Sequence, residues 1–299
     1  MKSRLGLSWG VFLGTLIVFV SGVEILHKYR NKQSVSYQCR IVIDKDLAAD
    51  EILSKEEDSK ATKPQLYERT SYGILPKKQP DCSKIFNAYA SDVIYDGEFV
   101  KVAVIIDENS DLDKIQKIVD ACGDTKVSFV LPHYLPNIKN IANAIITNGC
   151  EFFIQLPTTT SIPSELKNKV SPFLANSNPQ DLLDKLNYLI SSAQYAIGIA
   201  NVSETLITKS SKDMTLMMRE LSQRGLAFLC IDENDDVLGE ISSSVKFINL
   251  KANAFYKESD IKNGDALFVR ESQFEDFIKA LPKNIKCVPI SFKVKNASI

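Results

Sequence analysis

From residue 100 onward the chain alternates short apolar runs with longer amphipathic stretches. The apolar runs predict strands at 100–107, 126–132, 151–157, 195–201 and 226–232, with weaker ones at 245–250, 266–270 and 286–292. Between them, apolar residues recur every three or four positions and predict helices at 112–122, 137–149, 179–193, 212–225 and 272–281. Strand–helix alternation at this spacing is typical of parallel strands joined by right-handed crossovers. The sequence therefore predicts an α/β fold.

The N-terminal region has a different pattern. No charged residue occurs from Leu5 to Val23, and Glu24 ends the run. As a helix this run would reach about 28 Å, close to the thickness of a bilayer core. We expect a membrane anchor within residues 1–30; a cleaved signal peptide is the alternative, although its apolar region is normally shorter. Basic residues flank both sides, so charge does not set the orientation.

A polar, charged stretch follows the predicted anchor. Residues 31–71 lack sustained periodicity and predict a linker, which places the folded domain at 72–295. Hydrophobic residues make up 44% and charged residues 24% of the chain, a globular composition.

Several classes of function are disfavoured by composition and motifs. The formal net charge is −1 and no face is dense in Lys and Arg, which argues against nucleic-acid binding. The chain has neither a Gly-x-Gly-x-x-Gly after the first strand nor a Gly-Lys-Ser/Thr loop, which argues against nucleotide binding. The six cysteines form no Cys-x-x-Cys pair. Cys122 and Cys150 each precede a predicted strand and could lie close together, either bonded or as buried thiols.

Candidate chemistry lies at the C-terminal ends of the predicted strands, where ligand sites of parallel sheets are found. Two adjacent carboxylates, Asp107 and Glu108, follow the first strand. Such neighbours repel, so one of them must share a proton, bind a cation or turn to solvent. Alternatively, Asp107 caps the helix at 112–122 and Glu108 points outward. The polar residues at the other strand ends are His133, Gln155, Asn201 and Asp232.

Three familiar kinds of active site fit this set poorly. A receiver-type signalling site needs an aspartate after the third strand, where Gln155 stands. The chain has two histidines, His27 and His133, so an ordinary three-ligand zinc site cannot be built; carboxylate and carbonyl oxygens could still hold a harder divalent ion weakly. Serine or cysteine hydrolysis lacks both a Gly-x-Ser-x-Gly motif and a supply of histidine bases.

The segment "LPTTTS" at 156–161 could offer hydroxyl groups to a polar ligand or form an ordinary loop. It follows the third predicted strand directly, so either role would place it at the same end of the sheet as the acidic pair.

An ordered set of motifs resembles the divergent polysaccharide deacetylase family. The motifs are "KVAVIID", "FVLPHYLPN", "NGCEFFIQLP", "AIGIAN", "LSQRGLAFL" and "KCVPIS", preceded by the lead-in "YGILPKKQPDCSKIFNAYA". The resemblance extends from Tyr72 to Ser291. It implies an incomplete or distorted (β/α) barrel, a carbohydrate partner such as a cell-envelope glycan, and a single-pass inner-membrane protein with its C-terminal domain in the periplasm.

The same resemblance implies roles for the acidic pair. Asp107 would act as the general base on a water molecule, and Glu108 would bind the metal that polarises an N-acetyl carbonyl. His133, Gln155, Asn201 and Asp232 would line the substrate pocket.

Departures from the family pattern weaken the implied metal site. The usual acidic pair is Asp-Asp, and Glu108 moves its carboxylate by about 1.5 Å, beyond metal-bond tolerance. A histidine of the family pattern is replaced by Cys150, and Cys230 stands where an acid is expected, with Asp232 two residues later. We therefore expect at most a weakly bound divalent metal and a deacetylase activity that is weakened or lost. An active hydrolase rebuilt around Asp107 and Glu108, and a non-catalytic envelope binding protein, remain as alternatives.

Overall fold

A computed structural model of the chain describes residues 66–123, 125–159, 161–167, 170–203, 209–231, 235–257 and 261–294. The predicted membrane anchor, most of the predicted linker and Asp232 lie outside these ranges. Within them, no helix combines the length and the apolar character needed to cross a bilayer.

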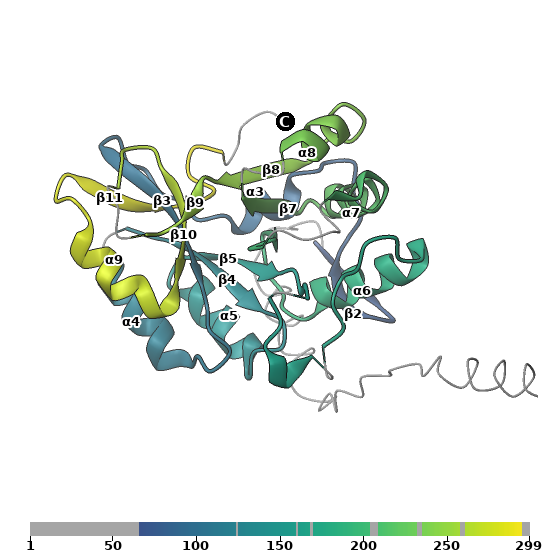
Figure 1. Cartoon of the computed structure of the whole chain (residues 1–299), viewed down its shortest axis with the longest axis horizontal. Helices are drawn as coiled ribbons and strands as arrows, with labels where there is room; N and C mark the ends of the chain where they lie inside the picture. Colours follow the sequence, from purple (N-terminus) through teal and green to yellow (C-terminus); the bar gives the residue numbers. More distant parts are fainter. Residues whose placement is uncertain are drawn as a thin grey trace, which may run out of the picture. The chain divides into compact units, whose positions relative to one another are not determined.

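The described residues form a parallel nine-stranded sheet, which confirms the predicted α/β class (Figure 1). The strand order is β8-β7-β6-β5-β4-β3-β10-β9, and β11 pairs with the first half of β3. The strands are β3 (Glu98–Ile105), β4 (Ser128–Pro132), β5 (Glu151–Gln155), β6 (Gly198–Ala200), β7 (Ala227–Ile231), β8 (Ile248–Ala252), β9 (Ala254–Phe255), β10 (Ala266–Arg270) and β11 (Ile285–Pro289). The helices between them are α4 (Leu112–Cys122), α5 (Ile138–Thr147), α6 (Pro179–Ser191), α7 (Ser211–Gln223), α8 (Asp235–Ser242) and α9 (Phe274–Ala280).

A single residue, Asn253, carries the chain from one end of the sheet to the other. Strands β8 and β9 occupy the two ends of the strand order, yet only Asn253 separates them in sequence. Its backbone N–H donates to the Ala266 carbonyl at 2.6 Å, and its Oδ1 accepts from the Ala266 N–H at 2.8 Å. The sheet therefore curls into a nearly closed barrel, as the family resemblance implied.

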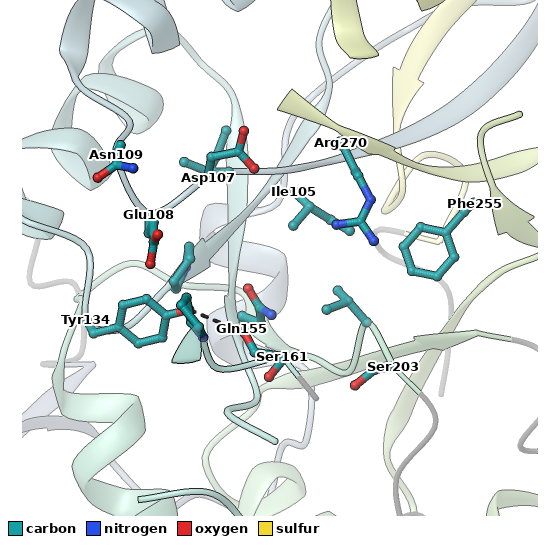
Figure 2. Close-up of a pocket in the computed structure, with 14 residues that line it drawn as sticks. Ile105, Asp107, Glu108, Asn109, Tyr134, Gln155, Ser161, Ser203, Phe255 and Arg270 are labelled. Carbon is teal, nitrogen blue, oxygen red and sulfur yellow. Dashed lines mark hydrogen bonds between the residues drawn. The ribbon is translucent and has the colours of Figure 1, made fainter. Parts of the chain in front are cut away.

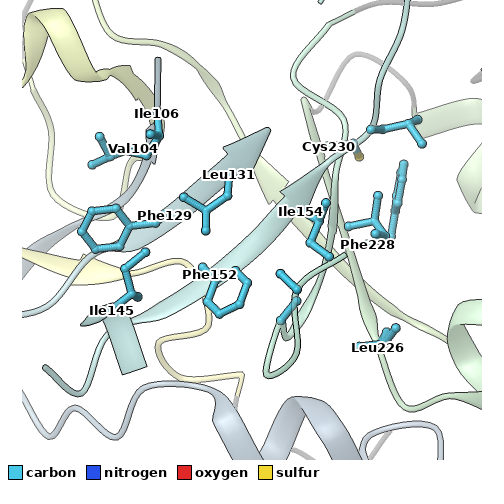
Figure 3. Close-up of a cluster of buried hydrophobic side chains, with 14 of the residues drawn as sticks. Val104, Ile106, Phe129, Leu131, Ile145, Phe152, Ile154, Leu226, Phe228 and Cys230 are labelled. Atoms are coloured by element: carbon cyan, nitrogen blue, oxygen red, sulfur yellow. The ribbon is translucent and has the colours of Figure 1, made fainter. Parts of the chain in front are cut away.

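Alternate residues of each strand enter two different apolar layers. Ala103, Val130, Phe153, Leu229 and Phe268 belong to a cluster that fills the barrel interior. Their sequence neighbours, among them Val104, Phe129, Phe152 and Phe228, belong to the layer packed under the helices (Figure 3). Strands buried on both faces explain the unbroken apolar runs of the sequence.

Three elements at the start of the domain were not predicted. Strands β1 (Tyr67–Thr70) and β2 (Gly73–Pro76) form a hairpin, and the first of them lies inside the segment expected to be linker. Helix α3 (Lys84–Tyr89) places Phe86 in the interior cluster. It lies close to Gly225 after α7, where φ is +70° and a Cβ would come within 2.9 Å of two backbone nitrogens of α3. These elements are too short for their periodicity to be visible.

Of the two alternatives that the sequence left open for Cys122 and Cys150, a disulfide or buried thiols, the structure shows thiols. Burial raises the pKa of both, and the thiol of Cys287 adds to the effect on Cys122. These groups behave as small apolar side chains of the helix-facing layer.

The N-terminal end of the barrel is held by a completely buried carboxylate. Glu151, at the start of β5, accepts hydrogen bonds from the backbone N–H of Ser91 at 2.8 Å, from Ser128 Oγ at 2.6 Å, and from both the N–H and the hydroxyl of Ser291. Ser128 Oγ in turn accepts from the N–H of Ile290 at 2.8 Å. We call this set the Glu151 network. It joins β4 and β5 to the segments just before β3 and just after β11.

Replacement of Glu151 by alanine tests this network. The substitution leaves the N–H groups of Ser91 and Ser291 buried without an acceptor, so we expect a loss of about 3 kcal/mol or more in the free energy of unfolding. Urea denaturation followed by circular dichroism measures the loss. The exposed Glu165→Ala serves as the control and should leave the midpoint unchanged. Equal midpoints for Glu151→Ala and wild type would show that the network does not hold the barrel.

Candidate functional site

A cavity of about 420 Å³ opens at the C-terminal ends of the strands (Figure 2). The ends of β3, β4, β5 and β10, together with β9 and the loops after β5 and β6, line it. This volume suits a small molecule or one to two sugar rings. The cavity contains Asp107, Glu108 and Gln155, so the structure brings together three of the residues predicted to form the site.

Glu271 fixes the loop that carries the acidic pair. It follows β10 directly, and its side chain is only 7% exposed. One carboxylate oxygen accepts from the N–H of Asp107 at 2.8 Å, and the other accepts from Ser110 Oγ at 2.8 Å. Lys114 Nζ lies 3.6 Å from the second oxygen. The loop between β3 and α4 is thus anchored at both ends by one side chain.

The carboxylate of Asp107 lines the cavity and does not cap the following helix. Asp111 has the capping role instead, since its Oδ1 accepts from the N–H of Lys114 at 3.0 Å. Although Asp107 keeps contact with solvent, partial burial raises the pKa of its carboxyl, and the charge of Glu271 adds to this. Lys114 and Arg270 oppose the shift. A carboxyl with a raised pKa in a cleft is suited to proton transfer.

Glu108 lies beside Tyr134 in the cavity wall. Burial raises the pKa of the Tyr134 hydroxyl to about 12, and the charge of Glu108 contributes. That hydroxyl donates to the Ser161 carbonyl at 3.4 Å. Tyr134 therefore stays protonated at neutral pH, with its ring at the cavity surface.

The hydroxyl groups of the "LPTTTS" segment mainly organise their own loop. Thr158 is completely buried, and its Oγ1 lies 2.9 Å from Ser161 Oγ and 3.0 Å from Ser203 Oγ, just after β6. Ser161 and Ser203 also line the cavity. Thr158 thus has the loop role, while Ser161 of this segment lines the cavity together with Ser203 after β6; a contact of the segment with a ligand stays a prediction.

A cation and an aromatic ring form another part of the wall. Arg270 ends β10, and its guanidinium lies 5.6 Å from the centre of the Phe255 ring of β9. The side chain of Gln155 reaches the cavity from the end of β5 (Figure 2).

His133 and Asn201 are placed differently from expectation, since neither lines the cavity. His133 follows the end of β4 and packs edge-on against the Tyr134 ring, with ring centroids 5.3 Å apart, while Asn201 is flanked by Ala200 and Val202 of the interior cluster. Within the described residues, His133 Nδ1 and Asn201 Oδ1 are buried without a hydrogen-bond partner. Asp232, the remaining predicted pocket residue, lies outside those residues.

Four site residues were missed by the sequence reasoning: Tyr134, Phe255, Arg270 and Glu271. Arg270 could have been predicted, because it is the last residue of a predicted strand and ligand sites of parallel sheets lie at the C-terminal ends of strands. Tyr134 gave no such signal, because it lies in the turn after β4, where strand alternation does not set the direction of a side chain. Phe255 and Glu271 gave no such signal, since β9 and the turn that contains Glu271 are too short to be recognised from periodicity.

The described residues do not form a site that fits the divalent metal implied by the resemblance. Among them, no group of three or more His, Cys, Asp or Glu side chains could hold an ion. Asp107 and Glu108 supply two carboxylates, while His133 does not line the cavity. We therefore derive no reaction step through a metal.

Comparisons with known proteins give one family and one fold. A family model described as divergent polysaccharide deacetylase matches residues 102–263, more than half of the chain. The structure of an uncharacterized protein from Agrobacterium tumefaciens C58 is similar, with a TM-score of 0.57 and 17% identity over 76% of this chain and 98% of that one. At that identity the likeness shows the fold alone.

Two more distant structures were also matched. A CE4 family pseudoenzyme from Bacillus anthracis has a TM-score of 0.37 and 12% identity, over 66% of this chain and 65% of that one. A family 4 carbohydrate esterase from Streptomyces lividans has a TM-score of 0.35 and 8% identity, over 64% and 91%. A comparison with curated protein sequences gave no match.

The Glu271 anchor predicts the behaviour of the acidic loop. Glu271→Ala removes the acceptor of two hydrogen bonds, so amide exchange in residues 107–110 should accelerate by about tenfold, in line with one to two lost bonds. Hydrogen exchange read by mass spectrometry measures this. Glu275→Ala, exposed on α9, is the matched control and should change nothing. Unchanged protection in Glu271→Ala would show that other contacts hold the loop.

The burial of His133 predicts an unusual titration. Burial lowers its pKa to about 4, below the value of about 6.5 expected in an unfolded chain. The folded protein therefore prefers the neutral imidazole, and this contribution to stability is complete above pH 6.5 and is lost as the pH falls toward 4. NMR of the imidazole protons should show His133 neutral at pH 5.5. Titration near pH 6.5 would contradict its burial in the folded protein.

Proposed function

Because the chain belongs to the divergent polysaccharide deacetylase family, we propose that it binds a cell-envelope carbohydrate in the cavity at the C-terminal ends of its strands. In this proposal deacetylase activity is weakened or lost. One observation carries it: the cavity offers the groups that bind a sugar, while its described residues lack a set of metal ligands.

The polar groups of the cavity suit the hydroxyl and amide groups of a sugar. The carboxylates of Asp107 and Glu108 and the amide of Gln155 make no side-chain hydrogen bond to other residues within the described ranges. They are therefore available as acceptors, and Gln155 also as a donor. Tyr134 and Phe255 supply rings against which the C–H face of a sugar can pack.

Hydrolysis of an N-acetyl group needs more than these residues provide. Asp107, with its raised pKa, is suited to take a proton from water. Polarisation of the amide carbonyl requires a metal or a fixed donor that can stabilise negative charge on the oxygen. Glu108 is an acceptor and cannot fill that role when ionised. Binding of the carbohydrate thus follows from the site more directly than its cleavage.

The proposal includes a cellular location for the protein. Residues 1–30 would anchor the chain in the inner membrane by a single span, with the C-terminal domain in the periplasm, where envelope glycans are accessible. The length of the uncharged segment from Leu5 to Val23 supports the anchor.

The raised pKa of Asp107 favours one alternative, an active hydrolase with a rebuilt acidic site. In that case Asp107 would act as the base, with Glu108 beside it. This alternative predicts pH-dependent acetate release that disappears in Asp107→Asn without loss of folding.

An experiment on the purified full chain separates binding from hydrolysis. After incubation with zinc and removal of excess metal, we expect far less than one zinc per chain and no acetate release from N-acetylated envelope oligosaccharides. The same oligosaccharides should bind, and Asp107→Asn should weaken binding by about tenfold, the cost of one charge-assisted hydrogen bond. Asp113→Asn, exposed in the first turn of α4, is the matched control.

Two results would contradict the proposal. Stoichiometric zinc together with acetate release that depends on Asp107 would establish the rebuilt hydrolase. Absence of any glycan binding, with protein partners captured instead by crosslinking in membranes, would establish an envelope protein of another kind.

A further inference from the structure

The cavity has a charge asymmetry that points to a narrower ligand class. We infer that it selects a sugar that bears a carboxylate, and that this carboxylate binds the guanidinium of Arg270. The inference rests on the proposed carbohydrate function and adds to it the chemical class of the ligand.

Arg270 is the positively charged residue among those that line the cavity in the described part of the chain. Its contact there is the Phe255 ring, 5.6 Å from the guanidinium carbon. Among the described residues, no carboxylate lies within ion-pair distance of the guanidinium and no acceptor hydrogen-bonds to it. The charge of Arg270 opposes the rise in the pKa of Asp107, but the two side chains form no ion pair. The charge of Arg270 is therefore not neutralised by a protein partner in these residues.

The contact with Phe255 leaves N–H donors of Arg270 available. A guanidinium carries five N–H donors around a planar edge, and one ring 5.6 Å from its central carbon cannot occupy all of them. Those donors match the two oxygens of a carboxylate in a bidentate pair.

The acidic pair fixes the orientation of such a ligand. Figure 2 shows Arg270 and Phe255 on the opposite side of the cavity from Glu108 and Tyr134. An anion near Glu108 would be repelled, whereas hydroxyl or amino groups can donate to that carboxylate. The carboxylate of the sugar therefore lies at Arg270, and its neutral or amino-bearing part lies at Glu108, with Gln155 between them.

A carboxylate fits this balance of charge better than a phosphate monoester. Among the described residues, the cavity wall carries two carboxylates and one guanidinium. A phosphate monoester carries about −1.5 to −2 charges near neutral pH and would be repelled more strongly by Asp107 and Glu108 than a singly charged carboxylate.

The test compares acidic sugars with their uncharged counterparts on the full-length protein. Two acidic probes are used: a disaccharide of N-acetylglucosamine with a hexuronic acid, and one with a lactyl-ether sugar. Each is paired with its carboxyl-reduced alcohol form. By titration calorimetry, at least one acidic probe should bind wild type about tenfold or more tighter than its alcohol form, as expected for a charge-assisted bidentate pair. The preference should shrink in high salt.

Variants then assign the preference to Arg270. Arg270→Gln should lose most of the preference for the acidic probe over its alcohol form. Binding of the alcohol form should change less than about twofold, because only the charge-assisted contact is removed. Arg270→Lys should restore part of the preference, since a lysine keeps the charge without the fork. Arg219→Gln, exposed on α7 outside the cavity, is the matched control and should behave as wild type. Thermal unfolding checks that each variant is folded.

The possible failures are distinguishable. Wild type that binds both forms equally, or an Arg270→Gln variant that weakens both forms equally, overturns the inference and leaves the proposed function standing. Wild type that prefers a phosphorylated sugar to both acidic probes overturns the assignment of a carboxylate. Wild type that binds no probe of either form overturns the inference together with the proposed function.

Discussion

A buried carboxylate holds the two ends of this domain to the barrel. Glu151 lies at the N-terminal start of a central strand and receives hydrogen bonds from the segment before β3, from β4 and from the segment after β11. Burial raises its pKa, and the hydrogen bonds compensate by favouring the ionised form. Because the network fixes β4 and β5 at one end, it also fixes where they end at the other. The cavity is built on those ends.

The site depends on the pairing of strands that are far apart in sequence. Strand β10 pairs with β3 so that Arg270 stands opposite Ile105. The residue after Arg270 can therefore reach the loop after β3, and Glu271 binds the backbone of Asp107. Two consecutive residues thus serve the same cavity in different ways. Arg270 faces the cavity, and Glu271 holds the acidic loop in position.

Local periodicity was sufficient to predict the main elements. The helix over 112–122 and the strand over 266–270 have the predicted bounds, because their apolar spacing is regular and their ends are marked. The hairpin β1–β2 and helix α3 were missed, since four to six residues hold too little pattern and their apolar side chains are buried by contacts with distant elements. The closure through Asn253 is likewise a long-range property that no local pattern reveals.

The direction of a strand predicts at which end of the sheet a residue lies. It does not predict whether the side chain of that residue enters the cavity. Asp107, Glu108 and Gln155 line the cavity, as expected because the carboxyl ends of parallel strands converge. His133 and Asn201 were placed on the same argument, but both follow the last residue of their strands and neither lines the cavity. Arg270 ends a predicted strand, yet it was not among the predicted site residues.

The most direct test of the account is a crystal structure of the protein with an N-acetylated envelope oligosaccharide, collected with anomalous data at the zinc edge. The account predicts an uncleaved sugar between Tyr134 and Phe255, within hydrogen-bond reach of Asp107 and Gln155, and no anomalous peak between Asp107 and Glu108. A sugar bound elsewhere on the domain, or a zinc ion between the two acids beside a deacetylated product, would contradict it.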